Sequence, residues 1–157
     1  LFVELASGQN GTLTPYPGQG VGQTWLGADG ATITLERGIL KASRGMGDDL
    51  MGSSSSISPW PNINKKTETY SRELAHIMGN NKLSKRVFKC NIEKTSSDEQ
   101  IEIWDITFKV DKFEESCSDA SFTFKNTYHV DDRGIVRKSS QYHSDTLGSV
   151  TIERLDR

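Results

Sequence analysis

The stretch from Gln23 to Leu50 constrains the fold most, because two tight turns divide it into three short strands. The first turn, Asp29-Gly30, is a dipeptide typical of β-hairpins, in which both central residues need a positive φ. Apolar and polar residues alternate from Thr32 to Glu36, which is the period of a strand with one buried face. A second turn at Arg37-Gly38 leads into a third strand that begins at Ile39. This stretch therefore predicts a β-meander.

The same alternation recurs along the rest of the chain and predicts an all-β fold. Further strands are expected over Leu1–Leu5, Leu83–Ile92, Gln100–Phe113, Phe122–Val130, Ile135–His143 and Val150–Leu155. The second and third of these should form a long hairpin around a polar turn at Thr95–Asp98. A change of phase in the second strand of this hairpin predicts either a bulge near Trp104 or a segment covered on both sides. About nine strands would form a single antiparallel sheet, curled into a sandwich or a partly open barrel, with few or no helices.

Three segments do not show clear alternation. Ser7–Gly22 and Gly52–Asn62 are rich in glycine, proline or serine, and both are predicted to be loops. Residues 65–78 combine apolar residues at helical spacing with β-favouring threonine and tyrosine. A strand is favoured there, and a short helix remains the alternative.

The length and charge fit one domain without an electrostatic footprint for nucleic acid. The 157 residues match the usual size of a domain, which we expect to span residues 1–157. Because 19 basic side chains nearly balance 21 acidic ones, no nucleic-acid partner is expected. No run approaches the roughly 20 apolar residues that cross a bilayer as a helix. Since Leu1 follows no initiator Met or signal-peptide pattern, we expect a mature or trimmed fragment.

Paired carboxylates are the first candidate for chemistry. Asp48 or Asp49 could act on a glycan together with Glu115 or Asp131, if two carboxyls faced each other about 5–9.5 Å apart across a groove. Adjacent residues point apart, however, so the expected role of Asp48-Asp49 is to cap a short turn.

Histidines near the C-terminal turn are the second candidate. His129, Asp131, Asp132 and His143 could converge as a zinc or general-base set. Alternation directs His129 outward and leaves both aspartates in a solvated turn. Phosphate-loop and serine-elbow motifs are also absent from the sequence. We therefore predict no catalytic residue, no metal site and no cofactor.

Three residues are candidates for binding. Tyr16 and Trp60 each lie beside a proline in a predicted loop, where an exposed ring could stack on a sugar. Asn126 faces inward between Phe124 and Tyr128, so its amide should bind backbone groups or a ligand.

Two blocks of sequence resemble the exopolysaccharide and capsule lipoprotein family of the YjbF/GfcB type. The first runs from Trp25 through Asp29-Gly30 and Gly38-Ile39-Leu40 to the Ser-x-Gly-Met-Gly-Asp-Asp-Leu motif that ends at Leu50. The second comprises an Asn-x-Tyr-x-x-Asp motif starting at Asn126 and a Gly-x-x-x-x-Ser-x-Gln motif starting at Gly134. Together they cover roughly half of the chain well.

The resemblance implies a location and a role. It implies a periplasmic domain at the outer membrane, held by a lipid on a cysteine upstream of Leu1, with no other membrane contact. It further implies a non-catalytic role in capsule or exopolysaccharide assembly or export, with export proteins or a glycan as partners. In an oxidising periplasm Cys90 and Cys117 could form a disulfide that fastens the loop after the second long strand, and two reduced, buried cysteines are the alternative.

Two other functions remain open. A glycan-modifying enzyme would need the paired carboxylates. A carrier of an acyl chain would need a continuous apolar cavity behind Phe122, Phe124 and Trp104.

Overall fold

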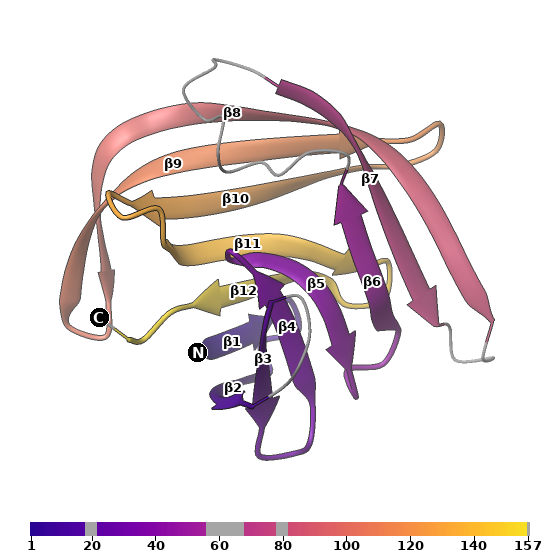
Figure 1. Ribbon diagram of the computed structural model, residues 1–157, viewed down its shortest axis with the longest axis horizontal. Coiled ribbons are helices and arrows are strands. Elements are labelled where there is room, and N and C mark those ends of the chain that lie inside the picture. The colour runs from indigo at the N-terminus through magenta and orange to yellow at the C-terminus, as the bar shows by residue number, and fades with distance from the viewer. Residues whose placement is uncertain (18–21, 56–67, 78–81, 157) are drawn as a thin grey trace.

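The computed structural model describes residues 1–17, 22–55, 68–77 and 82–156, and this part of the chain is all-β, as predicted (Figure 1). Twelve strands are present where about nine were expected: β1 (Phe2–Leu5), β2 (Asn10–Tyr16), β3 (Gln23–Gly27), β4 (Thr32–Glu36), β5 (Ile39–Arg44), β6 (Asp49–Ser55), β7 (Glu68–Ile77), β8 (Leu83–Ile103), β9 (Ile106–Ser118), β10 (Thr123–Asp131), β11 (Val136–Ser144) and β12 (Gly148–Glu153). Within these ranges no helix is long and apolar enough to span a membrane.

All twelve strands form one antiparallel sheet, in the order β5-β4-β3-β2-β1-β12-β11-β10-β9-β8-β7-β6. The sheet curls until its two edge strands, β5 and β6, lie side by side, so it is nearly closed into a barrel (Figure 1). Near its middle β1 pairs with β12, and Phe2 lies opposite Glu153. The first and the last strand are therefore neighbours.

Side chains complete the barrel where the two edge strands meet. The Leu50 N–H of β6 donates to Ser43 Oγ of β5 at 3.0 Å, and Arg44 Nη1 donates to the Leu50 carbonyl at 2.8 Å. From the opposite wall Gln141 Oε1 accepts the Leu40 N–H of β5 at 2.8 Å. These bonds satisfy edge groups that a closed ladder of backbone bonds would otherwise satisfy.

The predicted meander is confirmed as β3, β4 and β5, but the two predicted loops were wrong in part. Asn10–Tyr16 forms β2, which pairs with β1 and β3 although nearly all of its side chains are exposed. Gly52–Ser55 belongs to β6, which pairs with β7. Both strands depend on backbone pairing more than on side-chain burial, so neither shows apolar alternation. Trp60 and the rest of 56–67 lie outside the described residues.

Residues 68–77 form β7, which confirms the strand favoured for this part of the sequence. On one side β7 pairs with β6, and on the other side it pairs with β8. In the second pair Glu68 lies opposite Ile92 and Ile77 lies opposite Leu83.

The long hairpin of β8 and β9 turns at Trp104-Asp105, so the predicted turn at Thr95–Asp98 was wrong. Both turn residues have a positive φ, 47° for Trp104 and 61° for Asp105. Thr95–Asp98 instead coincides with two register shifts between β8 and β9. Such irregularities bend a strand pair, and the end of the hairpin is sharply bent relative to the rest of β8 and β9 (Figure 1). Beyond the bend, Glu99 Oε2 lies 3.9 Å from His129 Nε2 of β10, so this end of the hairpin stays against the sheet. Small polar residues suit a bulge as well as a turn, which explains the error.

A disulfide joins Cys90 of β8 to Cys117 of β9, with 4.1 Å between the Cα atoms. The pairing was expected, but its predicted position was wrong. Cys117 lies within β9 and directly opposite Cys90 in the ladder, so the bond ties neighbouring strands and not a following loop.

The interior is filled mainly by apolar side chains from all parts of the sheet. Phe124 stacks on Tyr142 with 4.4 Å between ring centroids and meets Phe88 edge-on at 5.0 Å. Trp104 lies elsewhere, at the exposed tip of the hairpin. The cavity that an acyl carrier was predicted to have behind Phe122, Phe124 and Trp104 is therefore not formed by these residues.

Candidate functional site

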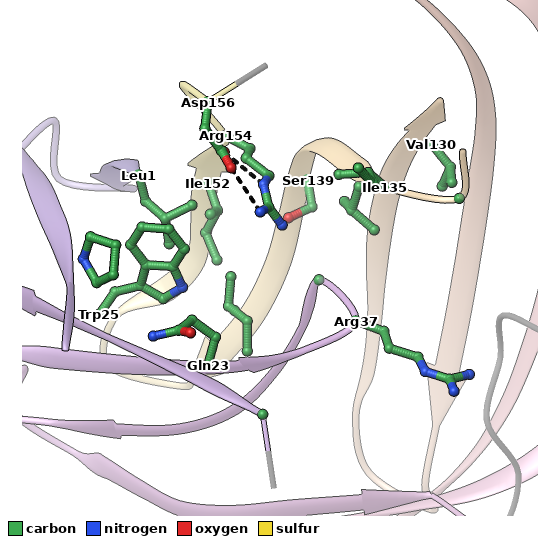
Figure 2. Close-up of a pocket in the computed structure, with 16 residues that line it drawn as sticks. Leu1, Gln23, Trp25, Arg37, Val130, Ile135, Ser139, Ile152, Arg154 and Asp156 are labelled. Carbon is green, nitrogen blue, oxygen red and sulfur yellow. Dashed lines mark hydrogen bonds and ion pairs between the residues drawn. The ribbon is translucent and has the colours of Figure 1, made fainter. Parts of the chain in front are cut away.

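An open cleft of about 670 Å³ lies between the β3–β5 side of the barrel and the strands β10–β12 (Figure 2). Its volume is within the range of small-molecule sites in proteins. We call it the Trp25 cleft. Its lining includes the side chains of Leu1, Gln23, Trp25, Leu35, Ser139, Ile152, Arg154 and Asp156.

Trp25 forms the floor of the cleft. It sits on β3 opposite Ile33 of β4, and only 8% of its surface is exposed. Leu1, Leu35 and Ile152 provide apolar surface around it. The indole Nε1 makes no hydrogen bond with any residue of the described chain, and it is not among the buried polar atoms that lack a partner, so it remains accessible. The floor therefore offers a ligand one unused donor within an apolar surface.

A charged pair lies on the wall opposite. Arg154 Nε and Nη2 donate to the two carboxylate oxygens of Asp156 at 2.7 and 2.8 Å (Figure 2). The hydrogen bonds from Arg154 lower the pKa of Asp156, so the carboxylate is ionised at neutral pH. This pair presents donors and acceptors next to each other at the mouth of the cleft.

Arg137 of β11 holds that wall in place. Its guanidinium is buried, forms an ion pair with Asp131 at 2.8 Å and donates from Nη1 to the Asp156 carbonyl at 2.6 Å. The Arg154 N–H in turn donates to the Arg137 carbonyl at 2.8 Å. Although burial opposes it, hydrogen bonds from the Ile135 N–H and Arg137 lower the pKa of Asp131. The C-terminal segment is thereby fixed beside Trp25.

The chain as a whole matches a known protein family. The family model described as "Group 4 capsule polysaccharide lipoprotein gfcB, YjbF" matches residues 1–155. The chain belongs to this family. The resemblance inferred from two sequence blocks is thus confirmed over nearly the whole length.

The fold of this capsule lipoprotein is shared with a solved structure. It matches the crystal structure of the hypothetical lipoprotein YmcC from Escherichia coli (K12) with a TM-score of 0.87 at 20% identity, covering 99% of this chain and 82% of that chain. No curated protein matches the chain.

The three predicted binding residues of the capsule lipoprotein lie in different surroundings. Tyr16 is half-exposed at the end of β2, and its carbonyl accepts a hydrogen bond from Gln23 Nε2 at 3.3 Å beside the cleft. Asn126 is buried, accepts the Tyr142 N–H at 2.6 Å and donates to Glu115 at 2.7 Å. Trp60 is outside the described ranges.

Glu115 is the centre of a buried network. It forms an ion pair with Arg72 at 2.6 Å and accepts hydrogen bonds from Tyr70, Tyr128 and Asn126. Burial would raise the pKa of Glu115, but the charge of Arg72 and these hydrogen bonds outweigh it and lower the pKa. Because Glu115 is fully buried and engaged on both oxygens, it is not available to act on a glycan.

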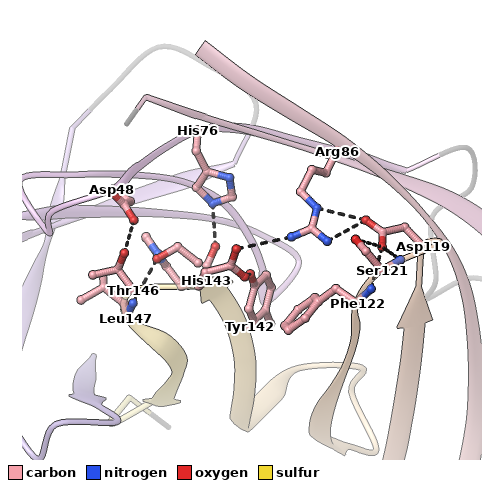
Figure 3. A network of polar contacts seen from close by, with 12 residues as sticks. Asp48, His76, Arg86, Asp119, Ser121, Phe122, Tyr142, His143, Thr146 and Leu147 are labelled. Carbon is pink, nitrogen blue, oxygen red and sulfur yellow. Dashed lines mark hydrogen bonds and ion pairs between the residues drawn. The ribbon is translucent and has the colours of Figure 1, made fainter. Parts of the chain in front are cut away.

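The other carboxylates of the enzyme hypothesis also have structural partners. Asp48 accepts a hydrogen bond from Thr146 (Figure 3). Asp49 accepts the Met46 N–H at 3.3 Å, a turn-capping contact of the kind predicted. Asp131 binds Arg137, as described above. Asp48 directly precedes β6 and Asp49 begins it, Asp131 ends β10, and Glu115 is near the C-terminal end of β9. Each of these carboxylates is therefore held by a hydrogen bond or an ion pair to a neighbouring residue.

The candidate set of His129, His143 and Asp131-Asp132 is not brought together in the structure. His129 is half-buried near Glu99, with 3.9 Å between Nε2 and Oε2. His143 is buried at the far end of β11, where its Nε2 lies 2.7 Å from Ser43 Oγ. Its carbonyl is bound by His76 (Figure 3). The hairpin register separates the two histidines along β10 and β11, so they cannot share a ligand.

Cys90, Glu115 and Cys117 are the one group of three potential metal ligands found among the described residues, within 4.8 Å of one another. Both sulfurs are in the disulfide, so the group offers no thiolate to a metal.

Sequence reasoning missed Arg137, Arg154 and Asp156 as parts of a site. They come within reach of Trp25 only because β1 pairs with β12 and β3 lies two strands beyond β1. No local pattern indicates this long-range order. Trp25 itself was noted as the start of the first block that resembles the family and not as a binding residue.

Proposed function

We propose that this capsule lipoprotein assists the assembly or export of a capsule or exopolysaccharide, and that it does so by holding a segment of the glycan in the Trp25 cleft without changing it covalently. The observation that carries this proposal is the unused indole N–H of a nearly buried tryptophan on the floor of an open cleft.

The chemistry of the cleft fits a sugar. A pyranose ring has an apolar face and a rim of hydroxyl groups, each of which donates and accepts hydrogen bonds. Leu35 and Ile152 offer the apolar surface, and the Trp25 Nε1 offers a donor. The Arg154–Asp156 pair offers donors and acceptors side by side. Tyr16, at the neighbouring strand end, is a further ring on which a second sugar unit could stack.

A non-catalytic role follows from the same residues. Glycoside hydrolysis generally needs two carboxyl groups on opposite sides of the scissile bond. Of the described residues that line the cleft, Asp156 alone carries a carboxylate side chain, and it is bound to Arg154. We therefore assign this cleft to binding.

The location proposed for the domain is the periplasmic face of the outer membrane, held there by a lipid upstream of Leu1. Export proteins of the polysaccharide are the proposed protein partners. Expressing the full-length gene and separating inner from outer membranes tests this location, and recovery of the protein in the soluble fraction would contradict it.

Replacing Trp25 with Phe tests the glycan site. Trp25→Phe keeps an aromatic ring on β3 but removes the N–H, so loss of one hydrogen bond of about 1 kcal/mol should weaken binding about fivefold. Isothermal titration with oligosaccharides released from the capsule of the source strain measures this change. Trp104→Phe, at the distant hairpin tip, is the matched control and should bind like the wild type.

Two outcomes would reject the proposal. Wild-type protein that binds none of these oligosaccharides at millimolar concentration would leave the cleft without a glycan ligand. Shortened or altered oligosaccharides after incubation, detected by mass spectrometry, would favour the glycan-modifying enzyme instead.

A further inference from the structure

Trp104 is the most exposed large apolar side chain of the described residues. Its exposed fraction is 63%, and it stands at the apex of the hairpin formed by β8 and β9. Tryptophan in this position leaves a large apolar surface in water, which does not stabilise the folded chain.

The backbone at the apex is also unfavourable for this residue. Trp104 and Asp105 have φ values of 47° and 61°, the pattern of a two-residue turn that glycine and asparagine fit best. A bulky side chain rarely adopts a positive φ. Exposure and backbone conformation both disfavour tryptophan, so folding does not explain it. Such combinations are typical of residues that contact something else.

The apex of the hairpin lies close to the N-terminus of the chain. The curled hairpin brings Trp104 beside Phe2 of β1, with 6.3 Å between ring centroids in an edge-on arrangement. Leu1 precedes Phe2 directly, and the N-terminus is close to this end of the sheet (Figure 1). Two aromatic rings from segments far apart in the sequence thus meet beside the N-terminus.

We propose that Trp104 inserts into the interfacial layer of the lipid bilayer to which the lipoprotein is attached. Tryptophan is enriched at this depth of a membrane, because its apolar body and its N–H match the boundary between acyl chains and headgroups. The inference rests on the N-terminal lipid anchor proposed above, which would keep this end near the bilayer, and it does not depend on the glycan cleft.

The charges near the apex predict which phospholipid headgroup Trp104 contacts. Glu102 and Asp105 are exposed on either side of Trp104, and Lys109 is paired with Asp98 at 2.9 Å. An acidic apex is repelled by an anionic surface and not by a zwitterionic one. We therefore expect contact with zwitterionic phospholipid.

Quenching by brominated lipid tests the insertion directly. The chain is tethered through an N-terminal histidine tag to vesicles that contain chelating lipid and brominated phosphatidylcholine, so the test supplies its own anchor and is independent of the glycan proposal. Wild type is compared with Trp104→Asn, which suits the turn and should unfold at the same temperature or higher. Leu83→Asn removes another exposed apolar residue, 58% exposed, at the opposite end of β8 and is the control.

The two possible results change the quenched fraction of tryptophan fluorescence in opposite directions. If Trp104 is inserted, the fraction of tryptophan fluorescence that is quenched falls in Trp104→Asn and is unchanged in Leu83→Asn. Replacing part of the phosphatidylcholine by phosphatidylglycerol should then reduce quenching of the wild type. If Trp104 remains in water, the brominated lipid does not quench its fluorescence. Removing this residue in Trp104→Asn then raises the fraction of the remaining tryptophan fluorescence that is quenched. That result would overturn the proposal and leave a protein partner as the alternative.

Discussion

At the scale of single residues, Glu115 is the side chain on which the barrel interior depends most. Its carboxylate compensates the buried charge of Arg72, and it also orders the hydroxyls of Tyr70 and Tyr128. A buried ion pair adds little stability compared with apolar packing, but removing one partner leaves the other charge uncompensated in a medium of low dielectric constant.

Glu115→Gln should therefore destabilise the protein strongly. The expected loss is about 3–5 kcal/mol in the free energy of unfolding, because the buried Arg72 loses its counter-ion. Glu114→Gln is the matched control, since the neighbouring Glu114 is partly exposed and contacts Lys112 at 3.5 Å. Its loss should stay below about 0.5 kcal/mol. Urea unfolding followed by fluorescence measures both, and equal losses would refute the central role of Glu115.

At the scale of elements, the pair β8 and β9 is the most extensive unit of the sheet, and the disulfide lies within it. Cys90 and Cys117 are fully buried and directly opposite each other, next to the Glu115 network. The bond thus links β8 to β9, the strand that carries the buried Glu115.

Removing the disulfide should lower stability without changing the fold. Cross-linking residues 27 positions apart reduces the entropy of the unfolded chain by an amount worth about 3.5 kcal/mol. We expect Cys90→Ala/Cys117→Ala to lose about this free energy of unfolding in a urea titration. Dithiothreitol should destabilise the wild type similarly and leave the double variant unaffected. A double variant as stable as the oxidised wild type would contradict this.

Elements with one buried face could be predicted from the sequence, and elements without one could not. β4 and β10 alternate clearly because one side of each packs into the barrel. β2 is exposed on both faces, so its sequence looks like a loop. The turn at Trp104 was missed because tryptophan is unusual there. The Trp25 cleft could not be predicted either, since its walls come from both ends of the chain.

At the scale of the whole molecule, closure of the barrel depends on a buried polar seam. Ser43 of β5 contacts both the Leu50 N–H of β6 and the His143 ring of β11. His143 is fully buried, and its Nδ1 has no partner among the described residues. Burial, and next the neighbouring His76, lower the pKa of His143 to about 4, although Asp48 and Asp49 oppose the shift.

The seam should therefore make stability depend on pH. In the unfolded chain His143 takes up a proton below its ordinary pKa of 6.5, and in the folded protein only near pH 4, so the unfolded state binds more protons in between. The stability present above pH 6.5 should be lost as the pH falls toward 4, by about 3 kcal/mol. Unfolding measured between pH 7 and 4.5 should show this slope in the wild type and not in His143→Asn. A slope that persists in the variant would assign it to other groups.

The pairing of β1 with β12 has a consequence for how the protein is made. If the chain is exported to the location proposed above, N-terminus first, β1 reaches the periplasm long before residues 150–153 arrive to pair with it. Until then β1 lacks one neighbour, and the barrel cannot close. Contacts between residues so far apart in the sequence form slowly, so the barrel remains incomplete during most of the export of the chain. In the proposed location, a periplasmic chaperone that shields bare strands would have its longest opportunity on this protein at β1, the strand that follows the proposed anchor.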